Sequence, residues 1–130
     1  MDNIKLGFIL FVSLFTASCQ KADDNGELGA FWKLLEVEHH AEASKSDHRL
    51  QSLFMAVQLN LMQFSGNGLH YARFQHQGDS LFVQMIGDAD NEFFENFGFY
   101  GPELRFLIER LNRNSLVLKS EHTTLYFKKF

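Results

Sequence analysis

The chain has 130 residues, a net charge of −4 and a single cysteine, Cys19. This length fits one domain of roughly one hundred residues behind a leader segment, and one cysteine excludes an internal disulfide. The 12 lysine and arginine residues are scattered along the chain, whereas a nucleic-acid-binding surface needs them clustered. The sequence therefore predicts a single domain with no nucleic acid among its partners.

The first 18 residues have the features of an export signal. Lys5 supplies positive charge ahead of the apolar run 6–15. This run is too short to remain in a bilayer, because a helix needs about 20 apolar residues to cross one. The small residues 16–18 follow it, as at a cleavage site. We expect residues 1–18 to be a lipoprotein signal peptide.

The segment Thr16-Ala17-Ser18-Cys19 resembles the lipobox of bacterial lipoproteins. Leucine is usual three residues before the cysteine, where this chain has Thr16. The resemblance implies cleavage before Cys19 and attachment of lipid, such as palmitate, to its thiol. It also implies a membrane partner and a location in the cell envelope, at the outer membrane. The alternative is an ordinary signal peptide, cut near Ser18, that leaves a free thiol.

Residues 19–28 are predicted to be the lipidated cysteine and a flexible tether. The segment is polar and acidic, with Asp23, Asp24 and Glu27, and such composition favours a solvated chain. An acidic stretch behind the cysteine resembles the signal that sends some lipoproteins to the cell surface. The periplasmic face is the alternative. The folded domain is expected over residues 29–130.

Apolar and polar residues alternate through most of this domain, which is typical of β-strands. In the long segment 53–64, Val57, Leu59 and Leu61 would share one face, and Gly66-Asn67-Gly68 would turn the chain back. Strands are expected at 31–38, 53–64, 69–75, 80–86, from 106 onward, at 115–119 and at 123–128. Seven or eight short strands predict an all-β barrel or sandwich.

Two segments depart from this alternation. Residues 90–97 predict a short helix, with Asp90 or Asn91 as the N-cap and Gly98 after the last apolar residue. Its phenylalanines would close one end of the barrel. The polar segment 39–52 is expected to be a loop over a barrel mouth.

The opening residues 29–34, Gly-Ala-Phe-Trp-Lys-Leu, are similar to the first strand of lipocalin-like barrels. The segments after Glu95, notably 106–111, 115–120 and 125–130, resemble the end of small lipocalin-like bacterial lipoproteins of uncharacterised function. The resemblance implies a small up-and-down antiparallel lipocalin-like barrel of seven or eight strands with one short helix, behind a lipid anchor. This family has no agreed ligand or catalytic residues, so the resemblance transfers none.

The sequence predicts no catalytic residues, no metal site and no cofactor. His39 and His40 are adjacent, so a strand would point them to opposite faces, and His70 and His76 are six residues apart. No nucleophile elbow of the Gly-x-Ser-x-Gly type is present, and an acylated Cys19 could not act as a nucleophile. We expect a protein that is not an enzyme.

The aromatic residues after the predicted helix allow two functions. If they only fill the core, the domain is an envelope module that contacts a protein or a glycan. If they leave room at the barrel mouth, Phe97, Phe99 and Tyr100 would line a site for a small apolar or amphipathic ligand. We favour the binding of a small ligand over the interaction module. The sequence names no protein partner.

Overall fold

The computed structural model describes residues 25–66 and 68–130. The predicted signal peptide and Cys19 lie outside these residues. Within the described part of the chain, no helix is both long and apolar enough to cross a membrane.

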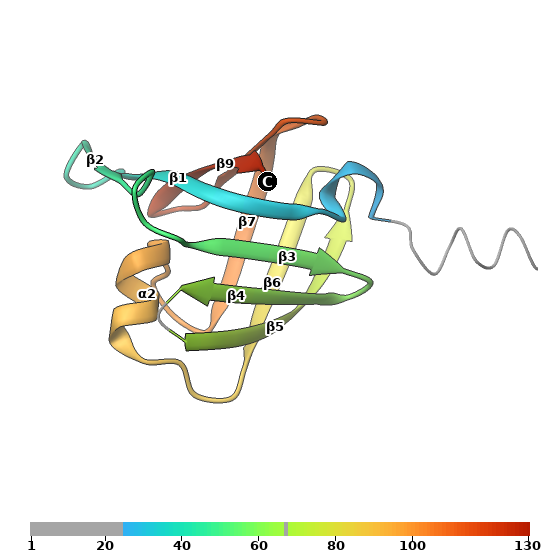
Figure 1. The fold of residues 1–130 in the computed structure, drawn as a ribbon, viewed down its shortest axis with the longest axis horizontal. Helices are drawn as coiled ribbons and strands as arrows, with labels where there is room; N and C mark the ends of the chain where they lie inside the picture. Colours follow the sequence, from blue (N-terminus) through green and yellow to red (C-terminus); the bar gives the residue numbers. More distant parts are fainter. Residues whose placement is uncertain (1–24, 67) are drawn as a thin grey trace, which may run out of the picture.

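Residues 25–66 and 68–130 form nine strands, a short 3-10 helix and one α-helix (Figure 1). In chain order they are η1 (Gly26–Leu28), β1 (Phe31–His39), β2 (Ser44–Asp47), β3 (Phe54–Gln58), β4 (Leu61–Gly66), β5 (Gly68–Gln77), β6 (Ser80–Ile86), α2 (Asn91–Phe97), β7 (Glu103–Leu111), β8 (Ser115–Lys119) and β9 (Thr123–Lys129).

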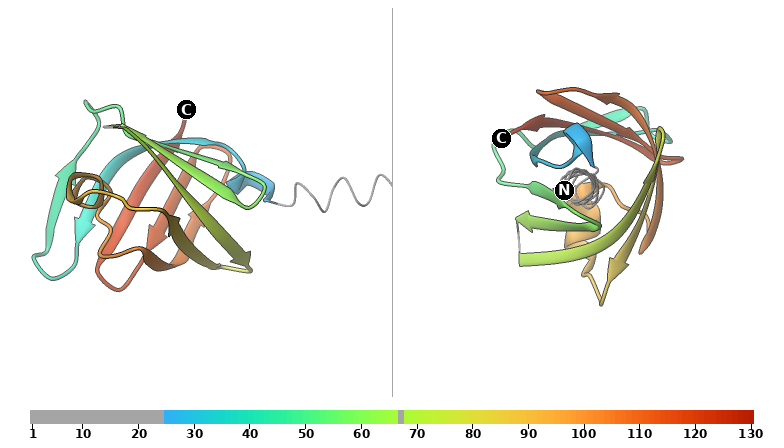
Figure 2. Two further views of the ribbon diagram at one scale, coloured as in Figure 1. Left: turned by 90° about the horizontal axis from the view of Figure 1, so that it is seen from below. Right: turned by 90° about the vertical axis from the view of Figure 1, so that its right-hand side faces the viewer.

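All strand pairs are antiparallel, and each strand from β3 to β8 pairs with the next. Pairing of β1 with β9 closes the sheet into a barrel, as both views in Figure 2 illustrate. Strands β2 and β3 pair with different halves of β1, so together they occupy one of eight strand positions. The predicted up-and-down all-β barrel is confirmed.

Most predicted strands match the observed ones, but the long strand at 53–64 is wrong. The chain reverses at Leu59-Asn60, and β3 and β4 form a hairpin in which Gln58 is opposite Leu61. Leu59 has a left-handed backbone, with φ of 55°. Val57 is buried, whereas Leu59 and Leu61 are about half exposed. These three residues therefore do not share one face of a strand.

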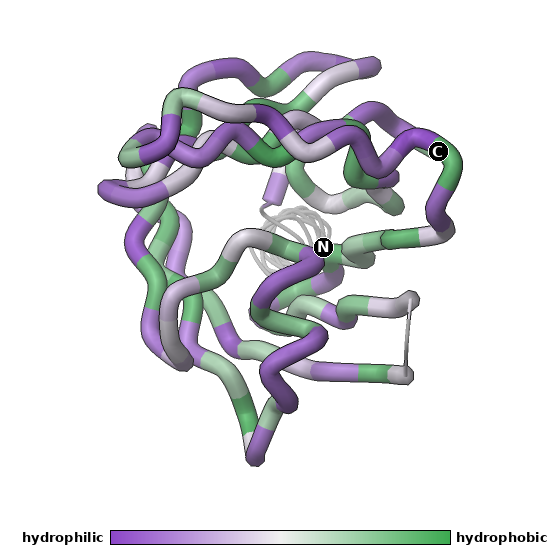
Figure 3. Tube along the Cα trace, turned by 90° about the vertical axis from the view of Figure 1, so that its left-hand side faces the viewer, coloured by the Kyte–Doolittle hydropathy of each residue, from purple (hydrophilic) through white to green (hydrophobic). Residues whose placement is uncertain are grey.

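The barrel interior is filled by one continuous cluster of buried apolar side chains. Hydrophobic and hydrophilic residues alternate along the strands, as seen from the α2 end in Figure 3. The alternation shifts within β1, where a bulge between Leu34 and Glu36 lets both Leu34 and Val37 point inward. Leu81, Val83 and Met85 are buried together, as predicted.

The folded domain begins a few residues before the predicted boundary at Gly29. Leu28 in η1 is fully buried, and its carbonyl oxygen accepts a hydrogen bond from Trp32 Nε1 at 3.0 Å. The Asn25 side-chain amide donates to the carbonyl of Leu59 at 2.7 Å. Residues 25–28, which were predicted to belong to the tether, therefore pack against the end of the barrel where β1 begins and where the β3–β4 turn lies.

Helix α2 covers the opposite end of the barrel (Figure 1). It begins as predicted, because the Asp90 carboxylate caps it by accepting a hydrogen bond from Phe93 N at 2.8 Å. It ends at Gly98, whose φ of 67° is left-handed. Phe93 and Phe97 are buried in the core, and Phe94 packs against it half-buried.

Candidate ligand-binding cleft

The aromatic side chains of α2 continue the core to its end. Phe64 on β4 packs against Phe93, Phe97 and Phe99, with ring centroids 5.2–5.5 Å apart. The cavity left beside this cluster measures about 10 Å³, which is the lower limit for one water molecule. This end of the barrel is therefore packed with side chains and has no room for a ligand.

A larger cleft lies on the outer side of α2, facing the end of β1. It measures about 460 Å³, within the range of small-molecule sites. Phe94, Phe99 and Tyr100 supply aromatic surface, and His39, Asn91 and Glu95 supply polar groups. We call this the α2 cleft.

The three residues predicted to bind ligand are close in sequence but differ in position. Phe99 and Tyr100 both line the α2 cleft. Phe97 does not line it, because its side chain points into the core and is only 1% exposed. Tyr100 is 58% exposed, so it is the residue of the three that is free to contact a bound molecule.

Short contacts hold the walls of the α2 cleft in place. The hydroxyl of the buried Thr123 donates to the carbonyl of Gly98 at 3.0 Å, which joins the end of α2 to β9. The Tyr100 ring stacks on His122, with centroids 4.3 Å apart and planes 12° apart. His39 Nε2 is 3.1 Å from the Ser46 hydroxyl on β2. The cleft is therefore formed before any ligand arrives.

Sequence reasoning missed Asn91 and Glu95 as lining residues, and it did not name His39 among them. His39 was considered by name only as a metal ligand, although segment 39–52 was expected to be a loop over the barrel mouth. The structure places His39 at the end of β1, opposite Ser44 of β2, so part of the expected loop is a strand. Asn91 and Glu95 could have been found from the helix, because they lie four residues apart and therefore on one helical face.

Strand β2 is held by charged groups on β1. Arg49 Nη2 lies 2.8 Å from Glu36 Oε1, and Lys45 Nζ lies 3.9 Å from Glu36 and 3.8 Å from Glu38. Hydrogen bonds from the Arg49 backbone and side chain lower the pKa of Asp47. These groups lie outside the α2 cleft and position β2 beside it.

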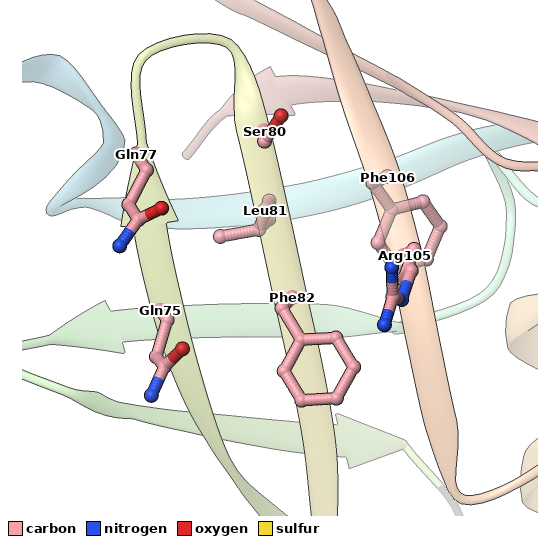
Figure 4. A pocket seen from close by; sticks show the side chains of 7 residues that line it. All are labelled: Gln75, Gln77, Ser80, Leu81, Phe82, Arg105 and Phe106. Atoms are coloured by element: carbon pink, nitrogen blue, oxygen red, sulfur yellow. The ribbon is translucent and has the colours of Figure 1, made fainter.

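A second cleft, of about 370 Å³, lies on the outer surface of β5, β6 and β7. Figure 4 shows the Phe82 ring between Gln75 and Arg105, and the Arg105 guanidinium is 5.4 Å from the ring centroid. Glutamine and serine side chains form much of the remaining wall. It is smaller than the α2 cleft and offers one outward-facing aromatic ring.

Among the described residues, no group of three or more His, Cys, Asp or Glu side chains is placed to hold a metal ion. His39 and His40 have separate partners: His40 Nε2 is 2.8 Å from the Thr124 hydroxyl, on β9. His76 Nε2 is 2.8 Å from the carbonyl oxygen of Gly78. The His40 and His76 side chains therefore form hydrogen bonds within the neighbouring strand and turn.

A family model described as a lipocalin-like domain matches residues 13–130. The chain belongs to this lipocalin-like family. A lipocalin-like protein from Bacteroides uniformis has a similar structure, with a TM-score of 0.68 and 22% identity over 81% of this chain and 100% of that one. An uncharacterized protein from Bacteroides eggerthii gives a TM-score of 0.59 and 20% identity, over 78% of this chain and 98% of that one. No curated protein matches.

Membership in the lipocalin-like family confirms the resemblance drawn from Trp32 and the C-terminal strands. The lipocalin-like fold supports a ligand-binding barrel, and families of this kind are generally binding proteins and not enzymes. At these identities the two solved structures show the fold alone.

Proposed function

We propose that this protein is a non-catalytic, lipid-anchored binding protein of the bacterial cell envelope, and that its ligand binds in the α2 cleft. The observation that carries this proposal is the pairing of an aromatic cleft of about 460 Å³ with a packed barrel interior. A ligand in the lumen would have to displace Phe64, Phe93 or Phe97. A ligand in the α2 cleft displaces only solvent.

The lining of the α2 cleft indicates the chemistry of the ligand. Phe94, Phe99 and Tyr100 favour an apolar or aromatic body. Glu95 is the lining residue that carries a formal charge at neutral pH, so the polar end of the ligand is neutral or cationic. We therefore infer a small amphipathic molecule without a negative charge.

Binding of N-phenyl-1-naphthylamine, a neutral aromatic probe, tests this site. Tyr100→Ala removes an exposed ring of the cleft and should weaken binding about five- to tenfold, since one lost aromatic contact is worth about 1 kcal/mol. Tyr71→Ala is the matched control, because Tyr71 is 45% exposed on β5 and does not line the α2 cleft. Equal loss of binding in both variants would contradict the proposed site.

Native mass spectrometry of the purified protein would reveal a co-purifying natural ligand.

The lipid anchor is the second part of the proposal. Acylation of Cys19 accounts for a lone thiol behind an export signal, and it places the domain at the outer membrane, on its periplasmic or surface face. Cells grown with labelled palmitate should label the wild-type protein and not Cys19→Ser. Protease treatment of intact cells would distinguish the surface face from the periplasmic one.

The packed interior also favours a second function, an envelope module that contacts a protein or glycan through its outer surface. Exposed tyrosines gathered in one patch would support it. Tyr71 on β5 and Tyr126 on β9 are instead four strand positions apart, on opposite sides of the barrel. A photo-crosslinker at Tyr100 that captures a protein in intact cells, while one at Tyr71 does not, would favour this module over the small-ligand site.

A further inference from the structure

Three phenylalanine rings and two lysines form a patch on the outer surface of β1, β3 and β9. Phe31 and Phe54 stack with centroids 5.1 Å apart, and Phe130 contacts both rings at 5.7 and 4.9 Å. Phe31 is 42% exposed and Phe130 is 71% exposed. Lys33 and Lys128 are direct neighbours across β1 and β9. We call these five residues the Phe–Lys patch.

The Phe–Lys patch is unfavourable in an isolated domain. Aromatic rings are exposed to water there, and two like charges are opposite each other, which destabilises a strand pair. Within residues 25–66 and 68–130, no carboxylate lies within 4.0 Å of the ammonium group of Lys33 or Lys128. The patch is positive although the chain as a whole carries a net charge of −4. A negatively charged, partly apolar surface would compensate both defects.

We propose that the Phe–Lys patch rests on the anionic bilayer to which the protein is anchored. Aromatic rings favour the membrane–water interface, and lysines are attracted to anionic head groups. A lipid anchor combined with a basic patch also holds a protein more firmly than one acyl chain alone. This inference rests on the lipid anchor proposed at Cys19.

The position of the patch in the chain supports this partner. Only Gly29 and Ala30 separate η1 from Phe31, and the backbone N–H of Phe130 donates to the carbonyl of Phe31 at 2.9 Å. Five residues lie between Cys19 and Asn25, and the six steps from one to the other can span at most about 20 Å. A tether this short gives the patch a high effective concentration at the bilayer, so a weak contact is sufficient.

Docking through the Phe–Lys patch would orient the α2 cleft. The first residues of the folded domain, in η1, and helix α2 lie at opposite ends of the barrel (Figure 1). With the β1 start near the bilayer, the α2 cleft opens away from it, toward the solvent from which a ligand would arrive.

Lysine footprinting on the whole lipidated protein tests the inference. The protein is placed in vesicles of phosphatidylcholine, with or without phosphatidylglycerol, and treated with a membrane-impermeant amine-reactive ester. Mass spectrometry then gives the labelling of each lysine. Labelling of Lys33 and Lys128 should fall at least fivefold in the anionic vesicles relative to detergent. Lys45 and Lys119, which lie in ion pairs elsewhere on the barrel, should change less than twofold and serve as internal controls.

Two double variants distinguish an effect of the Phe–Lys patch on labelling from an effect of exposed apolar side chains in general. Phe31→Ser with Phe130→Ser should restore the labelling of Lys128 in anionic vesicles. Leu69→Ser with Leu107→Ser, which removes two apolar side chains of similar exposure on β5 and β7, should leave Lys128 protected. Restored labelling in both double variants would overturn the assignment to the Phe–Lys patch.

Other outcomes would also overturn the inference. A protein that does not float with the vesicles disproves the lipid anchor, and the inference with it. A protein that floats with Lys128 unprotected disproves the patch alone and leaves the anchor and the α2 cleft standing. Protection that appears in detergent and rises with protein concentration would assign the patch to a second copy of the chain. Protection in intact cells but not in vesicles would assign it to another protein.

Discussion

Gly98 is the residue at which α2 meets the barrel wall. Its φ of 67° disfavours any side chain, and a Cβ placed there would lie 2.5 Å from Val37 Cγ1 and 3.3 Å from Thr123 Cγ2. Both neighbours belong to strands of the closed barrel, so neither can move freely. Glycine at this position is therefore required by the backbone and by packing together.

We predict that Gly98→Ala lowers the free energy of unfolding by about 2–5 kcal/mol, the sum of left-handed strain and overpacking. Gly78→Ala is the matched control: Gly78 has φ of 58°, but nothing lies within 4 Å of an added Cβ. It should lose only the strain, about 1–2 kcal/mol. Urea denaturation measures both, and equal losses would show that the contact with Val37 is unimportant.

Tyr126 couples stability to pH. Burial raises the pKa of its hydroxyl, with the Glu38 carboxylate as a further cause, and the hydroxyl donates to Glu38 Oε2 at 3.4 Å. In the unfolded chain a tyrosine loses its proton near pH 10, whereas the folded protein retains it to higher pH. The contribution of Tyr126 is therefore complete below about pH 10 and is lost as the pH rises through the folded pKa.

The expected outcome is a steeper alkaline loss of stability in the wild type than in Tyr126→Phe. Urea midpoints of both proteins, measured at pH 9, 10 and 11, provide the test, and titrations shared by both cancel in the difference. If the two midpoints fell in parallel, the Tyr126 hydroxyl would have no part in the pH dependence.

At the scale of elements, the strands that sequence predicted well are those with one buried and one solvated face. Segment 80–86 matches β6 to the residue. Segment 115–119 also matches β8 to the residue, although its three central residues are all buried. β2 was missed because Ser44–Asp47 has no apolar residue to alternate, and it pairs with β1 beside the ion pairs of Lys45 and Arg49. The break at Leu59 was missed because exposed leucines continue the apolar pattern through the turn.

That turn leads to a prediction for the β3–β4 hairpin. Leu59 holds a left-handed backbone, which costs a non-glycine residue about 1 kcal/mol or more, and it is half exposed. Asparagine tolerates this conformation better. Leu59→Asn should therefore raise the free energy of unfolding by up to about 1 kcal/mol, as measured by urea denaturation.

Leu61→Asn supplies the control for this hairpin. Leu61 has a similar exposure but lies within β4, at a position without positive φ. Asparagine is disfavoured in strands, so this variant should lose stability. Stabilisation of both variants would mean that removing an exposed leucine, and not relieving backbone strain, is the cause.

At the scale of the whole molecule, the barrel and its helix could be predicted, but the candidate site only in part. Sequence placed Phe97, Phe99 and Tyr100 together because they are adjacent in the chain. It could not separate the buried ring of Phe97 from the exposed ring of Tyr100, because that depends on the left-handed turn at Gly98 and the contact with β9. It placed segment 39–52 over the barrel mouth, but it could not single out His39, some 60 residues from Tyr100, as the residue of that segment that lines the cleft.

A filled barrel interior excludes a ligand site in the lumen and leaves the site beside α2. A substitution of Phe64 tests whether the interior is filled. Its ring contacts Phe93, Phe97 and Phe99. Phe64→Ala should lower the free energy of unfolding by about 3–5 kcal/mol and leave an apolar cavity. Such a cavity stays dry and accepts benzene, so benzene should raise the urea midpoint of the variant and leave that of the wild type unchanged. Phe64→Leu, with a smaller cavity, should lose less and gain less from benzene. A wild-type midpoint that rises with benzene as much as that of Phe64→Ala would mean that the native barrel is hollow, and the ligand site would then belong in the lumen.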